Sequence, residues 1–152
     1  LPLEPAKGYS VTVPRPEGVP ADLALYLPEG HACVTPFGGG LRFAGTLELS
    51  GMNDRVLTNR VAAIRRGAGR YFEGVETAPP TALWRGLRPM TPDGLPIVGR
   101  SDAYDNLVIA TGHNMNGIMY GPVTGKLVAE LIEGGAPSVD LSLLTPERFG
   151  IL

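Results

Sequence analysis

The stretch NLVIATGHNMNGIMYGPVTGKLVAELIEG, residues 106–134, limits most strongly what this chain can fold into. Its pattern predicts a short apolar strand over 107–110, a turn, and an amphipathic helix after Asn116. Four of its fourteen residues from 112 to 125 are glycines, namely Gly112, Gly117, Gly121 and Gly125. Each interior helix glycine costs roughly 1 kcal/mol relative to alanine, so backbone conformation or close approach must outweigh helix propensity here. The pattern favours a flat or anionic ligand close to this backbone.

The predicted helix start has the properties of an anion site. A helix that begins near Asn116 and Gly117 directs unpaired N–H groups and a partial positive charge away from its first turn. Such an end suits a phosphate, a carboxylate, or a carbonyl that gains negative charge during a reaction. An apolar face is predicted to anchor the rest of the helix in a core, formed by Val123, Leu127, Val128, Leu131 and Ile132.

Composition excludes several classes of protein. With 152 residues, 43% of them hydrophobic, the chain is long enough for one sizeable core, and no window resembles a membrane span or a signal peptide. A net charge of −2 gives no reason to expect nucleic acid. Cys33 is the single cysteine, which indicates a reducing cytoplasm rather than a disulfide or a zinc cluster. The start LPLEP, without Met, suggests a piece of something longer.

The remaining pattern predicts an α+β fold. Runs rich in β-forming residues indicate strands over 8–13, 21–27, 33–36, 41–49, 81–90 and 95–99. In the run 41–49, Leu41, Phe43, Gly45, Leu47 and Leu49 alternate with more polar residues and are predicted to face the core. A first helix is expected from about Asp54 to Tyr71, capped by Asn53 or Asp54. These elements predict a mixed, largely antiparallel sheet with two main helices.

Several motif matches fail. The triple glycine 38–40 is followed by a strand instead of a helix, so we interpret it as a hairpin loop rather than a dinucleotide fingerprint. The segment 121–126 has one residue too few for a phosphate-binding P-loop, which leaves Lys126 as a surface lysine. With two histidines and no acidic pair beside them, no metal site is expected.

Arg88 is the residue that most needs an explanation. It lies between Leu87 and Pro89 in a strand that should be mostly apolar, and a buried guanidinium requires a partner. A bidentate carboxylate is its best geometric match. The sequence leaves two alternatives open: the carboxylate of a ligand, or a salt bridge to Asp93 or Glu48.

These motifs together resemble a known family. The segments GYS at 8–10, TPFGGGLRFAGTLELSG at 35–51, WRGLRPMTPDGLPIVGR at 84–100 and the stretch at 106–132 are similar to the C-terminal part of the FAD-dependent D-amino acid oxidase and dehydrogenase superfamily, near glycine oxidase and D-amino acid dehydrogenase. The resemblance covers nearly the whole chain. It implies that residues 1–100 are a portion of the substrate-binding domain and that 101–152 are the last strand and helix of the FAD-binding domain.

The resemblance also implies roles for individual residues. Arg88 would hold the substrate carboxylate and Met119 would line the substrate pocket. The turn would meet the flavin of FAD, with cofactor contacts from Gly112, His113, Asn114, Met115, Asn116, Gly117 and Ile118. The backbone N–H groups of Asn116 and Gly117 would face N1 and C2=O of the flavin, where negative charge accumulates on reduction. No catalytic acid or base is assigned.

The implied chemistry is hydride transfer from a D-amino acid, glycine or an N-methyl amino acid to the flavin. The product is an imino acid, which water hydrolyses to a keto acid and ammonia. We expect the enzyme in the cytoplasm, or at the inner face of the membrane if it is a dehydrogenase.

One part of the family pattern is missing from this chain. The resemblance implies members of on the order of 350 to 420 residues, or two to three domains by length, that begin with a strand and GxGxxG. That strand and motif do not occur in these residues. We therefore expect the chain alone to be inactive, to lose FAD, and to self-associate through exposed apolar surface. Its expected partners are an amino acid and the missing Rossmann segment, in cis or in trans. Two alternatives stay open: a non-catalytic module for a small anion or a protein, and one subunit of a flavoenzyme with a split site.

Overall fold

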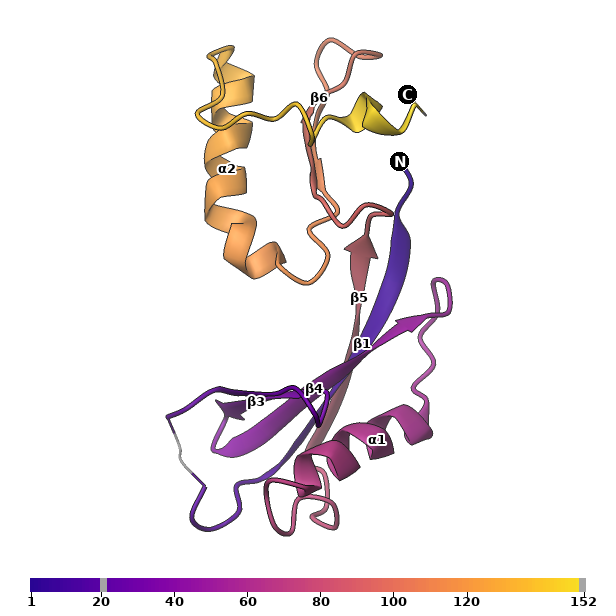
Figure 1. Ribbon diagram of the computed structural model, residues 1–152, viewed down its shortest axis with the longest axis vertical. Helices are drawn as coiled ribbons and strands as arrows, with labels where there is room; N and C mark the ends of the chain where they lie inside the picture. The colour runs from indigo at the N-terminus through magenta and orange to yellow at the C-terminus, as the bar shows by residue number, and fades with distance from the viewer. Residues whose placement is uncertain (20–21, 151–152) are drawn as a thin grey trace. The chain divides into compact units, whose positions relative to one another are not determined.

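The computed structural model describes residues 1–19 and 22–150. Two compact units make up the chain (Figure 1): Lys7–Leu87, which we call the sheet unit, and Leu1–Ala6 with Arg88–Leu152, which we call the C-terminal unit. Within the described part, the helices are too short or too polar to span a bilayer. The predicted α+β class is confirmed.

The sheet unit is built on five strands in the order β2-β3-β4-β1-β5. Their bounds are β1 Glu4–Pro14, β2 Leu25–Leu27, β3 Ala32–Phe37, β4 Gly40–Leu49 and β5 Ala82–Met90. Neighbours β2, β3 and β4 pair antiparallel. The predicted hairpin loop at the triple glycine is confirmed, because Phe37 pairs with Gly40 while Gly38 and Gly39 turn the chain at φ 56° and 80°.

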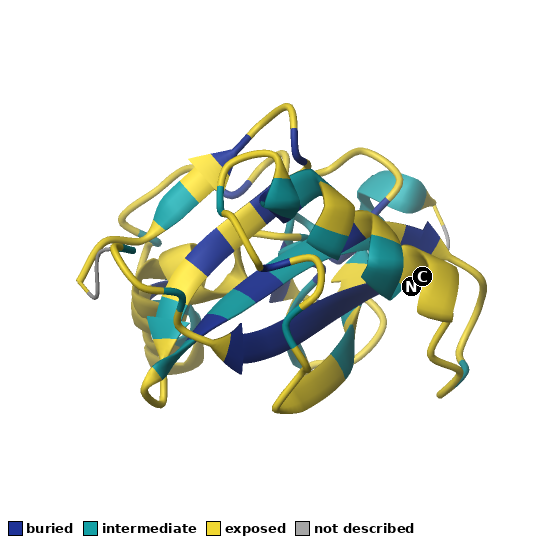
Figure 2. Cartoon of the chain, turned by 90° about the horizontal axis from the view of Figure 1, so that it is seen from below, coloured by how far each residue is buried: buried dark blue, intermediate teal, exposed yellow. Residues whose placement is uncertain are grey.

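Strand β2 is shorter than predicted. The expected strand 21–27 is observed only over Leu25–Leu27, and Ala21 lies outside the described residues. In contrast, the strand predicted over 8–13 extends in both directions as β1. Since β1 is an inner strand of the sheet, it is buried along most of its length, which Figure 2 shows as a dark blue ribbon.

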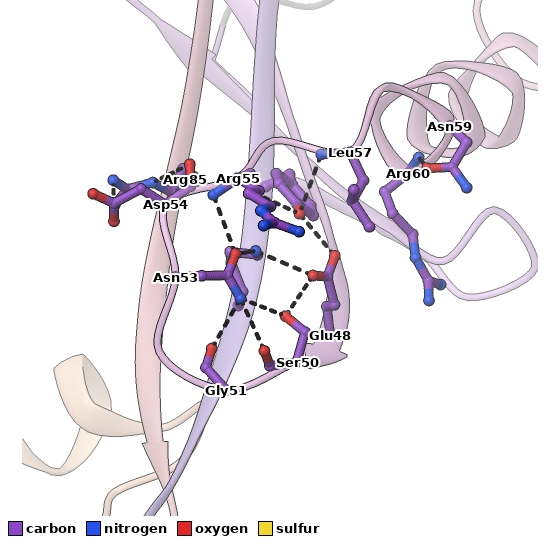
Figure 3. Close-up of polar contacts among 12 residues, drawn as sticks. Glu48, Ser50, Gly51, Asn53, Asp54, Arg55, Leu57, Asn59, Arg60 and Arg85 are labelled. Atoms are coloured by element: carbon purple, nitrogen blue, oxygen red, sulfur yellow. Dashed lines mark hydrogen bonds and ion pairs between the residues drawn. The ribbon is translucent and has the colours of Figure 1, made fainter.

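Helix α1 (Thr58–Gly69) begins four residues later than predicted. The expected cap, Asn53, instead uses its Oδ1 to accept from the Lys7 ammonium at 2.6 Å and from the Arg55 N–H at 3.1 Å (Figure 3). The Leu57 N–H donates to the hydroxyl of Tyr9 at 3.4 Å. These bonds hold residues 53–57 outside the helix, so the prediction that Asn53 or Asp54 caps it is wrong.

The core of the sheet unit lies between the sheet and α1. Ile64 and Ala68 of α1 pack against alternating residues of β1, β3 and β4, among them Val11, Val34 and Phe43. Burying a side chain of this size stabilises the fold by about 1.5 to 3 kcal/mol. The helix expected over 54–71 is therefore present over a shorter range, and Ile64 and Ala68 form its buried face.

The alternation predicted along β4 breaks at Thr46. Leu41 and Phe43 are buried as expected, but Leu47 and Leu49 are 45% and 63% exposed and Glu48 is buried. Thr46 has φ 73°, a left-handed conformation that is unusual for a β-branched residue and that interrupts the regular alternation of side chains. The prediction that Leu47 and Leu49 face the core is wrong for this reason.

Glu48 enters a polar cluster, which we call the Lys7 cluster: Lys7, Tyr9, Glu48, Ser50 and Asn53, of which Lys7, Tyr9 and Glu48 are buried. The Lys7 ammonium lies 3.1 Å from the Glu48 carboxylate, and both side chains are withdrawn from solvent. Ser50 and Tyr9 donate to the same carboxylate at 2.6 and 2.7 Å. These hydrogen bonds, and then the Lys7 charge, lower the pKa of Glu48 to about 2.

The C-terminal unit pairs β6 (Ile97–Arg100) with β7 (Val108–Thr111) and packs α2 (Gly117–Glu133) against them. Its core combines Val98, Leu127 and Leu141, with Leu131 and Leu144 beside them. The predicted apolar face of α2 is only partly correct, since Val123 and Ile132 are exposed. This unit takes in residues 88–100, and β6 within that range pairs with β7, whereas the assignment of 1–100 and 101–152 to a substrate-binding and an FAD-binding part stays a prediction.

Candidate functional site

The turn between β7 and α2 needs glycine at its first position. Gly112 has φ 72°, and a Cβ there would lie 2.5 Å from Cγ2 of Thr91. A side chain is therefore excluded both by the backbone conformation and by the neighbouring turn. The fold itself therefore requires glycine at position 112, and no ligand is needed to explain it.

The first turn of α2 offers free backbone donors. Asn116 precedes the helix, and its own N–H donates to the His113 carbonyl at 2.9 Å. The next three N–H groups, those of Gly117, Ile118 and Met119, have no acceptor among the described residues. The first turn contains no acidic residue. A group with partial negative charge fits this end of the helix.

The surface beside these donors is open and apolar. A Cβ at Gly117 would meet only the Cβ of His113, at 3.7 Å, and at Gly121 and Gly125 it would meet nothing within 4 Å. Ile118 is 97% exposed and Met119 is 73% exposed. Contacts within the described residues therefore do not account for these three glycines. A bulky partner could approach the helix closely here.

Asn114 joins this turn to the turn between β5 and β6. Its Oδ1 accepts from the Thr91 N–H at 3.0 Å, and its Nδ2 donates to the Gly94 carbonyl at 2.9 Å and to the Thr91 hydroxyl at 3.2 Å. Its own N–H donates to the Pro89 carbonyl at 3.3 Å. Sequence reasoning missed this connection, because it depends on a contact across 23 residues.

His113 is fixed against the helix. Its Nε2 lies 2.8 Å from the Thr124 hydroxyl, and burial lowers its pKa below the usual value of 6.5. The lowered pKa favours the neutral form of the ring.

Arg88 has a guanidinium nitrogen without a protein partner. Its Nη1 is buried and makes no hydrogen bond within the described part of the chain. The two carboxylates that could have paired with it are engaged elsewhere. Glu48 pairs with Lys7, and Asp93 receives two bonds from Arg148, at 2.8 and 3.2 Å, which lower the pKa of Asp93 to about 2. The salt-bridge interpretation of Arg88 is therefore wrong for both candidates, whereas the ligand interpretation is still untested.

All the predicted site residues lie in the C-terminal unit, and the turn beside Arg88 is bonded to the turn before α2. Their contacts with a cofactor or substrate remain predictions. Thr91 and Arg148 were not predicted as part of this arrangement. Among the described residues, no group of His, Cys, Asp and Glu side chains could hold a metal ion.

Comparisons with known proteins agree on the fold. The family described as FAD dependent oxidoreductase (DAO) matches residues 1–131. D-amino acid dehydrogenase from Bradyrhizobium diazoefficiens is 35% identical over 150 residues, and the enzyme of that name from Methylobacterium nodulans is 37% identical over 150 residues. Glycine oxidase from Geobacillus kaustophilus superimposes with a TM-score of 0.85 at 32% identity.

These matches cover nearly all of this chain but only part of each relative. The two dehydrogenases match 98% of the chain and 35% of their own length. The glycine oxidase structure matches 97% of the chain and 40% of its own length. The chain thus spans about a third of the length of the curated relatives it matches.

Proposed function

Because the chain belongs to the FAD dependent oxidoreductase (DAO) family, we propose that it is the C-terminal part of an enzyme that oxidises an amino acid. The substrate class comprises D-amino acids, glycine and N-methyl amino acids. When bound, FAD supplies the acceptor for the hydride that leaves the substrate Cα.

Arg88 carries the proposal. A buried guanidinium nitrogen without a partner is costly, and the carboxylate of an amino acid would satisfy it. Neither Asp93 nor Glu48 competes for it, because both are held by other cations. Binding the carboxylate fixes one end of the substrate and so orients its Cα–H bond.

The first turn of α2 suits the flavin of FAD. Its free N–H donors and the helix dipole favour a group that gains negative charge, as N1 and C2=O of a flavin do on reduction. The donors left free by the turn are those of Gly117, Ile118 and Met119, while the Asn116 N–H is used by His113. The open space over Gly117 admits a flat ring, and exposed Met115 and Met119 offer apolar contacts around it.

The remaining contacts to FAD, on this proposal, come from polypeptide outside these 152 residues. We expect the isolated chain to lose added FAD on gel filtration, because it does not contain the Rossmann motif that binds the pyrophosphate and the ribose of FAD. The complete polypeptide that contains the chain should keep the cofactor. Absorbance in the flavin bands after gel filtration measures both.

The outcome separates the proposal from its alternatives. Stoichiometric flavin on the isolated chain would show that the other contacts are not needed. A flavin-free complete polypeptide that recovers FAD only with a second protein would indicate a split site. Binding of small anions without any flavin in either form would favour a non-catalytic module and overturn the proposed function.

Gly117 provides a second test. Replacing it with valine in the complete polypeptide should push the flavin away from the first turn, since a β-branched side chain fills the open space. We expect weaker FAD binding, or a flavin reduction potential lowered by about 30 mV, which corresponds to about 1.4 kcal/mol for two electrons. The potential is measured by spectroelectrochemical titration.

Gly125→Val is the matched control, because Gly125 lies on the same helix about 12 Å further along, where an added Cβ would meet nothing within 4 Å. Both variants should keep near-normal circular dichroism. Normal flavin content and an unshifted potential in Gly117→Val would remove the flavin from this position.

A further inference from the structure

The side chain of Asn114 has every polar hydrogen in use. Oδ1 accepts from the Thr91 N–H, and the two protons of Nδ2 are directed to the Gly94 carbonyl and the Thr91 hydroxyl. In this arrangement the amide has no donor left for a ligand. A hydrogen bond donated by this amide to the cofactor would therefore require breaking one of the two bonds that Nδ2 makes.

The backbone of Asn114 is also unusual. Its φ of 55° is left-handed, a conformation that glycine adopts freely and that asparagine tolerates better than most residues. Glycine would adopt this left-handed conformation but could not make the side-chain bonds. Only asparagine satisfies the turn and also makes the three side-chain bonds.

These bonds act on the segment that follows Arg88. The Asn114 N–H binds the carbonyl of Pro89, the residue next to Arg88, and the side chain binds Thr91 and Gly94 in the turn after β5. Arg148 holds the same turn from another direction, through Asp93 and through the Leu95 carbonyl at 2.9 Å. The end of the strand that carries Arg88 is thus fixed by Asn114 at the turn before α2.

We propose that Asn114 is a positioning residue, which holds Arg88 in register with the turn before α2 so that carboxylate and cofactor are bound in a fixed relation. This inference rests on the proposed function, because it assigns Arg88 to a carboxylate. It adds a residue whose role is exerted through Pro89, Thr91 and Gly94 and not through contact with substrate.

The test compares Asn114→Gly and Asn114→Asp in the complete polypeptide. Asn114→Gly keeps the left-handed turn and removes the three bonds. Asn114→Asp keeps the acceptor for the Thr91 N–H but places an acceptor against the Gly94 carbonyl. Asn106→Gly, at an exposed turn residue before β7, controls for the flexibility that any new glycine introduces.

We expect Asn114→Gly to raise KM for the amino acid about tenfold, with kcat changed less than about twofold, since a small misplacement of a binding group weakens substrate orientation. The dissociation constant of acetate, read from its perturbation of the flavin spectrum, should rise by the same factor. Flavin content should stay normal. Asn114→Asp should also raise KM, and Asn106→Gly should not.

Hydrogen exchange supplies a readout without substrate or cofactor. In the flavin-free polypeptide, the peptide that contains Thr91 should exchange faster in Asn114→Gly than in the wild type, because its N–H has lost its acceptor. Asn106→Gly should leave that peptide unchanged. This measurement also reports on Asn114 if the proposed function fails.

Each result decides one point. Wild-type KM, acetate binding and exchange in Asn114→Gly would overturn the inference and leave Asn114 as a turn residue only. Loss of flavin with an unchanged KM would overturn it in favour of a cofactor role. A wild-type polypeptide that binds neither FAD nor acetate would overturn the proposed function, and unchanged exchange in the variant would then overturn the bridging role as well.

Discussion

Replacing Arg88 by alanine in the complete polypeptide is expected to lower kcat/KM for the amino acid about 30- to 1,000-fold, mainly through KM. A bidentate pair between a guanidinium and a carboxylate contributes roughly 2 to 4 kcal/mol to binding. The unpartnered Nη1 of Arg88 indicates that no carboxylate of the described chain already satisfies it. Steady-state kinetics with oxygen and with an artificial electron acceptor measures the loss whichever oxidant the enzyme uses.

Two further variants separate charge from geometry. Arg88→Lys keeps the positive charge but loses the planar fork, so it should recover only part of the activity. Arg85→Ala removes an arginine from the same strand, one whose partner is the exposed carboxylate of Asp54 at 2.5 Å. Since exposed ion pairs contribute about 0 to 1 kcal/mol, Arg85→Ala should stay within about twofold of wild type in kcat/KM.

The substrate itself gives a second control. An amine that lacks the carboxylate of the corresponding amino acid cannot use Arg88, so its already low kcat/KM should hardly change in Arg88→Ala. The preference for the amino acid over the amine should therefore collapse in the variant. A folded Arg88→Ala enzyme with wild-type preference would return Arg88 to a structural role and remove the main support for the substrate class.

Local patterns predicted the elements near the site well. The strand, turn and helix of 106–134 are found as β7, the turn at Gly112 and α2, because apolar runs, glycines and a helix start are encoded within a few residues of one another. The strands predicted over 81–90 and 95–99 are likewise found, as β5 and β6, and Gly94 has a left-handed φ of 76° in the turn between them. Such features need no knowledge of distant contacts.

Features set by distant partners could not be predicted. Thr46 reverses the alternation along β4, and nothing in the local pattern LRFAGTLEL distinguishes it from a regular strand. Asn53 looked like a helix cap, yet its side chain bonds Lys7, 46 residues away. At Asn53 a tertiary contact outweighed the local preference.

The salt bridge considered for Arg88 illustrates the same limit at the site. The sequence left Asp93 open as a salt-bridge partner, but Arg148, 55 residues later, takes it in a bidentate pair. The pairing of Asp93 with Arg148 becomes visible only when the turn after β5 and the end of the chain are seen together. What the structure adds to the site is therefore mainly the pairing of its charges.

The Lys7 cluster is expected to be the largest single contribution of polar groups to the stability of the sheet unit. Breaking a buried ion pair by removing one partner costs about 3 to 5 kcal/mol, because the remaining charge stays buried without compensation. Lys7 and Glu48 are withdrawn from solvent, and Lys7 also holds Asn53. Lys7→Met in the complete polypeptide should therefore lower the urea midpoint strongly with an unchanged slope.

A double-mutant cycle isolates the ion pair. Glu48→Gln alone should also destabilise, whereas Lys7→Met with Glu48→Gln should recover much of the loss, because no unpaired charge remains and the amide oxygen still accepts from Tyr9. Lys126→Met is the matched control: its pair with Glu130 on α2 is exposed, at 3.5 Å, so its loss should cost less than about 0.5 kcal/mol. Equal effects of Lys7→Met and Lys126→Met would show that the buried cluster is not stabilising.

Acid distinguishes this charge effect from simple loss of packing. The pKa of Glu48 is lowered from 4.5 to about 2, by hydrogen bonds from Ser50 and Tyr9 and then by Lys7. Because the folded pKa is the lower one, ionised Glu48 stabilises the fold fully above pH 4.5, and this contribution is lost as the pH falls toward 2. Without Lys7 the folded pKa lies closer to its ordinary value, so acid removes less stability from Lys7→Met than from the wild type. The difference in unfolding free energy between the wild type and Lys7→Met should therefore shrink as the pH is lowered from neutral. A difference that stays constant would show that Lys7 stabilises the fold through the packing of its side chain and not through its charge.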